Sequence, residues 1–548
     1  MQPLLRVENL SLSFGTTQVV KDVHFNVFPG QTLALVGESG SGKSLTCLSL
    51  MGLTQAKSSG TAHLEGAGNL LALSEKQLRA LRGKRIAMIF QEPMTSLNPV
   101  MSVGKQVQEA ILVHQKISSK EAKSKTIDLF QSVELPQPST LFHAYPHQLS
   151  GGQKQRVMIA MAMANQPDIL IADEPTTALD VTVQHHILDL LQRLAKAHQM
   201  AMIFITHDLG VVRKMADHVV VMRQGKIMEQ GPAHEVLSAP KAAYTQGLMA
   251  CRPPHQARPL RLPTVEDVMA GSLQNEDFNK ERPLFQPTSV LLEARNISVT
   301  YPGRGTSFWK KPTPFHAVKQ ANLQLYQGEI LGLVGESGSG KSTLGRALLR
   351  LQPHATGEIY FQGQALHTLQ GEALRKMRPH FQLIFQDPFA SLNPYLPIGE
   401  AIAEPMWVHR VHATKAACKN AALALMEQVG LSPDMYQRLP HQFSGGQRQR
   451  IGIARALGLS PKLLVCDESV AALDVSIQAQ ILNVLLELRE KFNLSILFIS
   501  HDLGVVRYLC DRILVMQHGQ IVEEGLPNPL FTTPQHPYTR TLIEGILP

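Results

Sequence analysis

The chain has few cysteines and no long apolar runs. Its 548 residues include five cysteines, and no two of them form a C-x-x-C pair. This spacing argues against a zinc site or a disulfide framework and favours a reducing compartment. No apolar run approaches the roughly 18 residues that a membrane-spanning helix needs, and Glu8 stands where a signal peptide would need its apolar core. We therefore predict that the chain neither spans a membrane nor is exported.

Basic tracts interleaved with aromatic residues, which are typical of nucleic-acid binding, are also missing. The formal net charge of +8 permits an anionic partner, but a solvated positive surface explains it equally well. A hydrophobic content of 44% with 18% charged residues is that of an ordinary folded protein. Because the chain is too long for one hydrophobic core, we expect two or more domains.

An internal repeat sets the domain organisation. The same eight residues, Gly-Glu-Ser-Gly-Ser-Gly-Lys-Ser, occur at 37–44 and at 335–342, and further along the chain 294 residues separate Asp173 from Asp467. Between the copies the sequence becomes rich in proline and polar residues, which is typical of a linker. We therefore predict a first domain, a linker and a second domain at residues 1–251, 252–290 and 291–548.

The apolar pattern predicts the same α/β fold in each copy. The stretches Leu5–Phe14 and Leu292–Tyr301 alternate apolar and polar residues, which indicates half-buried antiparallel strands. Short continuous apolar runs separated by helical segments indicate a mostly parallel sheet with crossover helices. Residues 92–148 and 387–442 read as helical insertions. The predicted fold class is α/β, with two tandem P-loop ATPase domains, each a mostly parallel sheet core with an antiparallel β subdomain and a helical insertion.

The repeated octapeptide lies between a strand-like run and a helical run. In a strand–loop–helix of this kind, glycines let successive backbone N–H groups converge on a polyphosphate, and the helix N-terminus adds its dipole. We expect Lys43 and Lys341 to reach the β- and γ-phosphates, and Ser44 and Ser342 to supply hydroxyl groups to Mg²⁺. The predicted nucleotide-binding residues are Gly37, Ser39, Gly40, Gly42, Lys43, Ser44, Gly335, Ser337, Gly338, Gly340, Lys341 and Ser342.

Acidic pairs end one strand in each copy. Asp173 and Asp467 are placed to hold Mg²⁺ through water, and the following Glu174 and Glu468 can accept a proton from an attacking water. An acidic pair could instead cap a helix. Their nearly equal distance from the two phosphate loops favours the catalytic interpretation.

Two further polar residues in each copy follow strands. Gln91 and Gln386 could contact Mg²⁺ and the attacking water while belonging to a mobile loop. His207 and His501 could contact the γ-phosphate and orient that water. A single histidine at a strand end is usually structural, but its matched placement in both copies favours catalysis.

The pentapeptides Leu149-Ser-Gly-Gly-Gln153 and Phe443-Ser-Gly-Gly-Gln447 resemble the signature sequence of the ATP-binding cassette (ABC) ATPases. The resemblance covers almost the whole chain except the linker. It implies ATP and Mg²⁺ as cofactors and two cassettes packed head to tail, so that each ATP lies between one copy's phosphate loop and the other copy's signature. It also implies that ATP is contacted by Ser150, Gly151, Gly152, Ser444, Gly445 and Gly446, and that the adenine stacks on Phe14 and Tyr301.

The second copy departs from the family pattern after its acidic pair. The first copy has Asp173-Glu-Pro-Thr, as the family does, whereas the second has Asp467-Glu-Ser-Val. Loss of the proline frees the backbone just after the base, which predicts weaker preorganisation. Because the acid itself is kept, we expect reduced rather than absent hydrolysis there.

Other motifs resemble one branch of the family, the dipeptide, oligopeptide and nickel importers. The stretches Phe90–Pro99 and Phe385–Pro394 are similar to the Gln-loops of that branch, and Thr533–Thr539 is similar to its C-terminal element, of which Pro240–Thr245 is a degraded copy. The match is nearest to fused, tandem ATPases that take up microcin C-like peptides or glutathione.

The resemblance implies an ATPase bound peripherally to the cytoplasmic face of the inner membrane. Its expected partners are two separate transmembrane permease subunits and, through them, a periplasmic or extracellular solute-binding protein. Peptide cargo would not be bound directly by this chain.

The alternative is a soluble tandem ABC ATPase that acts on ribosomes or nucleic acid. That class predicts a long charged helical linker or zinc-binding cysteines, and no large helical insertion. The proline-broken linker, the scattered cysteines and the two insertions favour the importer, with no nucleic-acid partner.

Overall fold

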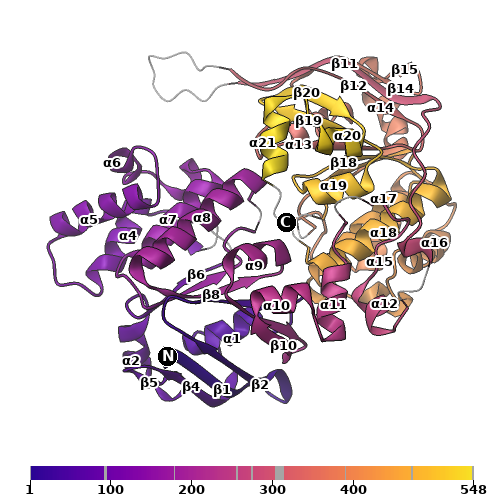
Figure 1. Ribbon diagram of the computed structural model, residues 1–548. Coiled ribbons are helices and arrows are strands. Elements are labelled where there is room, and N and C mark those ends of the chain that lie inside the picture. The colour runs from indigo at the N-terminus through magenta and orange to yellow at the C-terminus, as the bar shows by residue number, and fades with distance from the viewer. Residues whose placement is uncertain are drawn as a thin grey trace. The chain divides into compact units, whose positions relative to one another are not determined.

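The computed structural model describes residues 2–91, 96–177, 179–254, 257–272, 276–302, 314–388, 390–470 and 473–545 (Figure 1). These residues form two compact units. One comprises Met1–Ala250 and Val265–Ala270, and the other comprises Cys251–Thr264 and Gly271–Ile546. The domain boundaries given above stay a prediction.

The first unit contains two sheets. An antiparallel sheet in the order β2-β1-β4-β5 consists of β1 (Leu5–Phe14), β2 (Thr17–Val27), β4 (Lys57–Leu64) and β5 (Gly68–Asn69). A second sheet in the order β10-β9-β3-β8-β7-β6 consists of β3 (Thr32–Val36), β6 (Ile86–Ile89), β7 (Ile169–Asp173), β8 (Ala201–Thr206), β9 (His218–Arg223) and β10 (Lys226–Pro232). All its neighbouring strands are parallel except β9 and β10. The predicted combination of sheets is confirmed.

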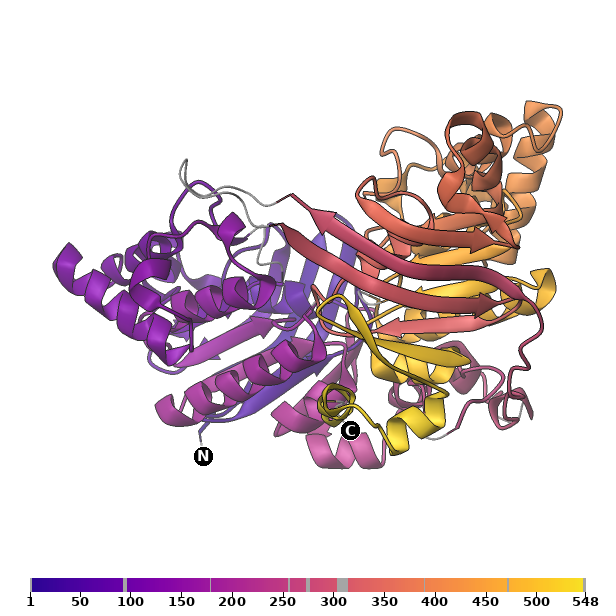
Figure 2. The same cartoon turned by 90° about the horizontal axis from the view of Figure 1, so that it is seen from above.

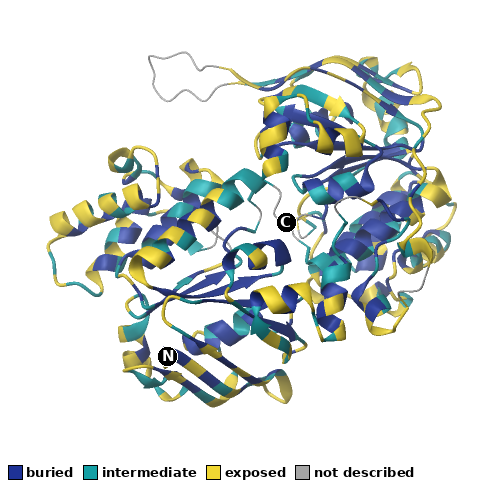
Figure 3. Cartoon of the chain, viewed as in Figure 1, coloured by how far each residue is buried: buried dark blue, intermediate teal, exposed yellow. Residues whose placement is uncertain are grey.

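Burial explains why the two kinds of strand have different sequence patterns. Every residue of β3, β7 and β8 is buried, because the parallel sheet is covered on both faces and needs no polar alternation (Figure 3). Strand β1 alternates buried and exposed residues instead. Its inner face shares one hydrophobic core with residues of β3 and of helix α1 (Lys43–Leu50), so the phosphate-loop helix is held between the two sheets.

Helices complete the first unit. The predicted insertion is confirmed as helical and consists of α4 (Val103–Leu112), α5 (Ser119–Ser132) and α6 (Pro138–Leu141). Val107 and Phe130 of the insertion share a buried core with Val157 of α7 (Gly151–Met163). The remaining helices are α2 (Glu75–Leu81), α8 (Val181–His198), α9 (Leu209–Met215), α10 (Ala233–Ser238), α11 (Ala243–Ala250) and α12 (Val265–Met269).

The second unit repeats this architecture. Its antiparallel sheet, β12-β11-β14-β15, consists of β11 (Val290–Tyr301), β12 (Phe315–Tyr326), β14 (Ala355–Phe361) and β15 (Gln364–Ala365). Figure 2 shows the long strands β11 and β12 side by side. The sheet β16-β17-β18-β13-β19-β20 consists of β13 (Ile330–Val334), β16 (Phe381–Ile384), β17 (Leu463–Asp467), β18 (Ser495–Ile499), β19 (Arg512–Gln517) and β20 (Gln520–Gly525).

The helices of the second unit follow the same order. They are α13 (Lys341–Leu348), α14 (Gly371–Met377), α15 (Ile398–Val408), α16 (Lys415–Gln428), α17 (Gly445–Leu457), α18 (Val475–Phe492), α19 (Leu503–Leu509), α20 (Pro527–Thr532) and α21 (Pro537–Glu544). In the part of the chain that the structure describes, no helix combines the length and the hydropathy that crossing a bilayer requires.

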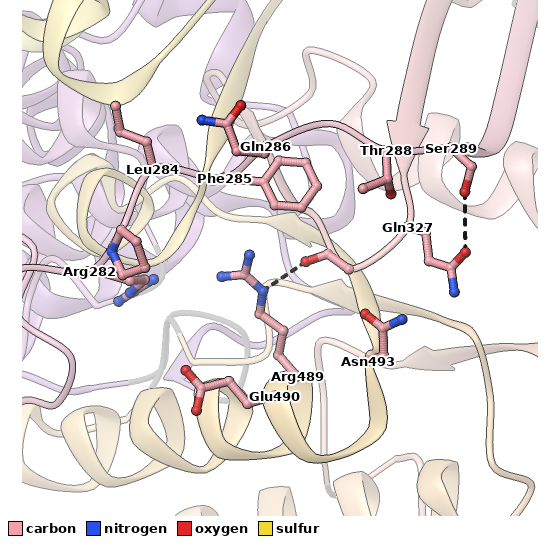
Figure 4. A pocket seen from close by; sticks show the side chains of 12 residues that line it. Arg282, Leu284, Phe285, Gln286, Thr288, Ser289, Gln327, Arg489, Glu490 and Asn493 are labelled. Carbon is pink, nitrogen blue, oxygen red and sulfur yellow. Dashed lines mark hydrogen bonds between the residues drawn. The ribbon is translucent and has the colours of Figure 1, made fainter.

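Part of the proline-rich segment between the copies packs on the second unit. The buried Arg258 guanidinium donates to the Cys510 carbonyl at 2.5 Å, and the Leu262 N–H donates to Asn483 Oδ1 at 2.9 Å. Residues 282–289 pass beside the end of α18, where they line an open cavity of about 670 Å³ (Figure 4). The segment is therefore anchored at several points rather than tethered only by its ends.

Candidate nucleotide-hydrolysis sites

Each phosphate loop joins a buried strand to a helix and curls around its own lysine. In the first unit, Lys43 Nζ donates to the carbonyl oxygens of Gly37 at 2.7 Å and of Glu38 at 2.8 Å. The same contacts in the second unit join Lys341 Nζ to the carbonyls of residues 335 and 336, at 2.8 and 2.9 Å. Both lysines are buried. The ammonium group therefore lies against two successive backbone carbonyls at the start of the loop.

The first glycine of each loop is required by close packing. Gly37 has a φ of +151°, and a Cβ atom there would lie 2.1 Å from the Met222 carbonyl oxygen of β9. Gly335 has the same φ, and its Cβ would lie 2.2 Å from the Met516 carbonyl of β19. Any side chain would push the loop off the sheet, because no real Cβ contact is this short.

The first unit brings the loop serine against the strand-end aspartate. Ser44 Oγ donates to Asp173 Oδ1 at 2.9 Å, and Asp173 is 5% exposed. The pKa of Asp173 is raised to about 6, because burial and the Glu174 charge together outweigh the Ser44 hydrogen bond and the Lys43 charge, which lower it. A hydroxyl and a carboxylate are hard oxygen donors of the kind that Mg²⁺ prefers, so this pair fits a magnesium ion that nucleotide phosphates also hold.

Glu174 lies at the centre of the first site. Its carboxylate accepts from Gln91 Nε2 at 3.0 Å and from Thr177 Oγ1 at 2.9 Å, and lies 3.2 Å from His207 Nδ1. Burial alone would raise the pKa of Glu174, but the contacts with His207, Thr177 and Lys43 outweigh it and lower the pKa to about 2. The carboxylate is thus ionised at neutral pH and can accept a proton. Thr177 was not predicted from sequence.

The second unit repeats this cluster. Ser342 Oγ donates to Asp467 Oδ1 at 2.6 Å, and Gln386 Nε2 donates to Glu468 Oε2 at 2.6 Å, whereas His501 Nδ1 lies 3.5 Å from Glu468 Oε1. Burial raises the pKa of Asp467 above its usual value. The pKa of Glu468 is lowered, because the His501 and Lys341 charges and the Gln386 hydrogen bond outweigh burial.

Two differences separate the clusters. Arg346 Nη2 lies 3.4 Å from Asp467 Oδ2 in the second unit, and the matching residue of the first unit is Leu48, which carries no charge. The residue that matches Thr177 in the sequence repeat is Ala471, which lies outside the described residues and has no hydroxyl group. A comparison of the two copies position by position could have revealed both differences.

The signature serines cap helices. Ser150 is the N-cap of α7 and Ser444 the N-cap of α17, and each side chain accepts a hydrogen bond from the backbone N–H of a glutamine three residues later. The glycines that follow begin each helix, so Gly151, Gly152, Gly445 and Gly446 present backbone N–H groups at a positive helix end. Such an arrangement can bind an anion, and the contact of these residues with ATP stays a prediction.

The predicted adenine-stacking aromatics end equivalent strands. Phe14 ends β1 and is 45% exposed, so its ring is available to stack. Tyr301 ends β11, is partly buried and makes an edge contact with the His354 ring at 6.0 Å. The loop after Tyr301, residues 303–313, lies outside the described residues, as do Ala178, Ala471 and Ala472.

Comparisons with known protein families agree with this geometry. A family model described as "ABC transporter" matches residues 20–177 and 318–471, and one described as "Oligopeptide/dipeptide transporter, C-terminal region" matches residues 228–277 and 522–548. The chain therefore belongs to the ABC transporter ATPases, and it is a tandem ATPase of the peptide-importer type. The second family model matches both halves, including the C-terminal element that is degraded in the first copy.

Individual relatives cover almost the whole chain. It is 46% identical to the "Glutathione import ATP-binding protein GsiA" of Pectobacterium atrosepticum over 561 residues, covering 99% of this chain and 89% of the relative. The protein of the same name from Escherichia coli (strain K12) is also 46% identical, with the same coverage. Among solved structures, the dimeric post-hydrolysis state of the ATP-binding cassette MJ0796 bound to ADP and Pi is 28% identical, covers 43% of this chain and 99% of its own, and has a TM-score of 0.40.

Proposed function

We propose that the chain is the ATP-hydrolysing, energy-coupling subunit of an importer for peptides of the di- and oligopeptide class, glutathione-like peptides included. The full-length similarity to relatives named for glutathione import, and the peptide-transporter match in both halves, support this assignment. Two separate transmembrane permease subunits would be its partners, with a solute-binding protein beyond them. The chain would act peripherally at the inner membrane face and would not contact the cargo.

The proposed catalytic unit is a composite site that uses both cassettes. One site would combine Lys43, Gln91, Asp173, Glu174 and His207 with Ser444, Gly445 and Gly446. The other would combine Lys341, Gln386, Asp467, Glu468 and His501 with Ser150, Gly151 and Gly152. The physical reason is that the signature helix of one cassette would supply anion-binding N–H groups to the side of the γ-phosphate that the other cassette's phosphate loop leaves uncovered.

The residues of each site have separate tasks in hydrolysis. The loop N–H groups and Lys43 would bind the phosphates, while Ser44 and Asp173 would hold the Mg²⁺ that neutralises their charge. Glu174, ionised and within 3.2 Å of His207, would accept the proton of the attacking water. The two contacts from Gln91 and Thr177 fix the carboxylate orientation. This ionised, triply supported glutamate is the observation that carries the assignment of hydrolysis.

Coupling to transport would follow from the nucleotide state. ATP would favour the closed pair of cassettes because it contacts both, and hydrolysis would remove that preference. Gln91 and Gln386 connect each catalytic glutamate to the helical insertion that follows in the chain. A change at the nucleotide would therefore reach the insertion, which would contact the permease.

Double-mutant cycles test the composite arrangement. Two residues that act on one ATP show coupling, whereas residues on separate ATP molecules give additive effects on ATPase rate. We expect coupling between Lys43→Arg and Ser444→Ala, and additivity between Lys43→Arg and Ser150→Ala. The reverse pattern would show that each cassette completes its own site, and would refute the composite proposal.

A further inference from the structure

A tyrosine from the C-terminal element of each cassette contacts the phosphate loop. Tyr244 of α11 is 1% exposed, and its hydroxyl accepts a hydrogen bond from the Glu38 backbone N–H at 3.1 Å. Tyr538 of α21 is 8% exposed, and its hydroxyl accepts from the Glu336 N–H at 2.9 Å. The two tyrosines are 294 residues apart, the same spacing that relates the catalytic acids. The contact is thus built twice, from elements about 200 residues beyond each loop, as the sequence separations of 206 and 202 show.

The tyrosine helices are fixed by a second matched contact. The Glu229 carboxylate of β10 accepts from the backbone N–H groups of Lys241 and Ala242, at 2.8 and 3.1 Å, just before α11. In the second unit, the Glu523 carboxylate of β20 accepts from the backbone N–H groups of residues 535 and 536, at 2.8 and 3.0 Å. Each C-terminal element is therefore tied to the sheet edge before it reaches the loop.

These contacts restrain one peptide of the loop from two sides. Lys43 Nζ holds the carbonyl oxygens of Gly37 and Glu38, while Tyr244 holds the N–H between them. Lys341 and Tyr538 do the same for residues 335 and 336. The Glu38 N–H therefore points at the tyrosine and away from a bound phosphate. A loop held in this shape before ATP arrives loses less conformational freedom on binding.

We propose that Tyr244 and Tyr538 are positioning residues that hold the phosphate loops in their ATP-binding shape, so that each C-terminal element sets the ATP affinity of its own cassette. The inference rests on the proposed nucleotide sites. It assigns the C-terminal element a task at the nucleotide, and it explains why the first copy keeps Tyr244-Thr245 although residues 241–243 differ from residues 535–537.

The test uses the full chain with one site disabled at a time. In a Lys341→Ala background only the first loop binds a fluorescent ATP analogue, MANT-ATP, and in a Lys43→Ala background only the second does. Tyr244→Phe keeps the ring and removes the hydroxyl, so we expect it to weaken MANT-ATP binding about three- to tenfold in the Lys341→Ala background. Tyr538→Phe in that same background is the matched control and should leave the affinity unchanged. The converse should hold in the Lys43→Ala background.

A kinetic split separates positioning from general damage. In the otherwise unaltered chain, each Tyr→Phe change should raise the KM for ATP by a similar factor, while kcat at saturating ATP changes by less than about twofold, because bound ATP reorders the loop. Equal affinity in Tyr244→Phe and its parent, or an equal loss from both tyrosine changes in one background, would overturn the inference. If instead Lys43→Ala and Lys341→Ala together still bind two nucleotides, the proposed sites themselves are wrong.

Discussion

The two glutamates proposed as catalytic bases have the same backbone conformation and different side-chain contacts. Glu174 and Glu468 both adopt left-handed φ angles, 45° and 47°, which is rare for a residue with a side chain. Glu174 is held by a threonine, a glutamine and a histidine at 3.2 Å or less. Glu468 has a glutamine at 2.6 Å and a histidine at 3.5 Å. The second copy of the sequence repeat has alanine at the position of Thr177 in the first copy.

This comparison adds side-chain differences to the asymmetry that the sequence predicts. From sequence, the replacement of Pro175 by Ser469 suggested a looser backbone after the second base. The φ of Glu468 matches that of Glu174 without the proline, so the strained conformation at the base does not depend on it. The looser backbone after the second base stays a prediction. A further difference lies in side chains: among the described residues no hydroxyl group contacts Glu468, and Arg346 lies beside the neighbouring Asp467. We therefore expect two working but unequal sites.

The largest expected effect comes from removing both bases. Glu174→Gln with Glu468→Gln should lower ATP hydrolysis by at least about 10²–10³-fold, because a positioned catalytic group is lost at each site. ATP binding should persist, since neither glutamate is placed on the phosphates. The check is steady-state phosphate release alongside ATP binding, with Lys43→Ala plus Lys341→Ala as the control that loses binding. Normal turnover in the glutamine variant would refute the assignment of the bases.

The single changes should be unequal. Glu174→Gln alone should remove more than half of the ATPase rate, and Glu468→Gln alone less than half, because the first base is better supported. Measuring phosphate release at saturating ATP and Mg²⁺ gives both values. Equal losses would show that the side-chain differences have no kinetic consequence.

A smaller effect is expected from the threonine. Thr177→Ala removes one hydrogen bond to Glu174 and introduces the alanine that the second copy has at this position. The rate of ATP hydrolysis at the first site should therefore fall about three- to tenfold. Measuring it in a Glu468→Gln background isolates that site. Thr177→Ser keeps the hydroxyl and should retain most of the rate. If Thr177→Ser is as slow as Thr177→Ala, the loss of rate comes from altered side-chain packing rather than from the lost hydrogen bond.

The smallest effect concerns Arg346, whose side chain is 40% exposed. An exposed ion pair is worth at most about 1 kcal/mol, so Arg346→Leu, which copies Leu48, should lower the half-saturating Mg²⁺ concentration of the second site by no more than about fivefold. The direction follows because a cation near Asp467 repels the metal. A Mg²⁺ titration in a Glu174→Gln background measures it, and a higher Mg²⁺ requirement would contradict the proposed metal role of Asp467.

Much of the fold could be predicted because its signals are local. The octapeptide lies beside a continuous apolar run, so strand, loop and α1 followed directly from neighbouring residues. The alternating pattern of β1 likewise marked an antiparallel strand. These predictions depended on the periodicity of apolar residues and on repeated motifs, both of which can be recognised in the amino-acid sequence.

The missed residues act through contacts that sequence does not display. Tyr244 reaches a loop residue 206 positions earlier, and only the folded sheet brings them together. Thr177 lies just after the Asp173-Glu-Pro-Thr motif, and the sequence does not display its contact with Glu174 three residues before. Arg346 contacts Asp467, which lies 121 positions later in the sequence. Aligning the two copies would have shown that Thr177 and Arg346 differ between them, but not that these residues contact Glu174 and Asp467.

The central claim is that each ATP is bound by opposite cassettes, and disulfide trapping tests it most directly. All five native cysteines are buried, so an engineered pair can be oxidised selectively. In the Glu174→Gln, Glu468→Gln chain, Ser150→Cys with Ser337→Cys should cross-link when ATP and Mg²⁺ are present and not in their absence. Ser150→Cys with Ser39→Cys, which places both thiols in one cassette, should not cross-link under either condition. An ATP-dependent bond in the second pair and none in the first would contradict the account.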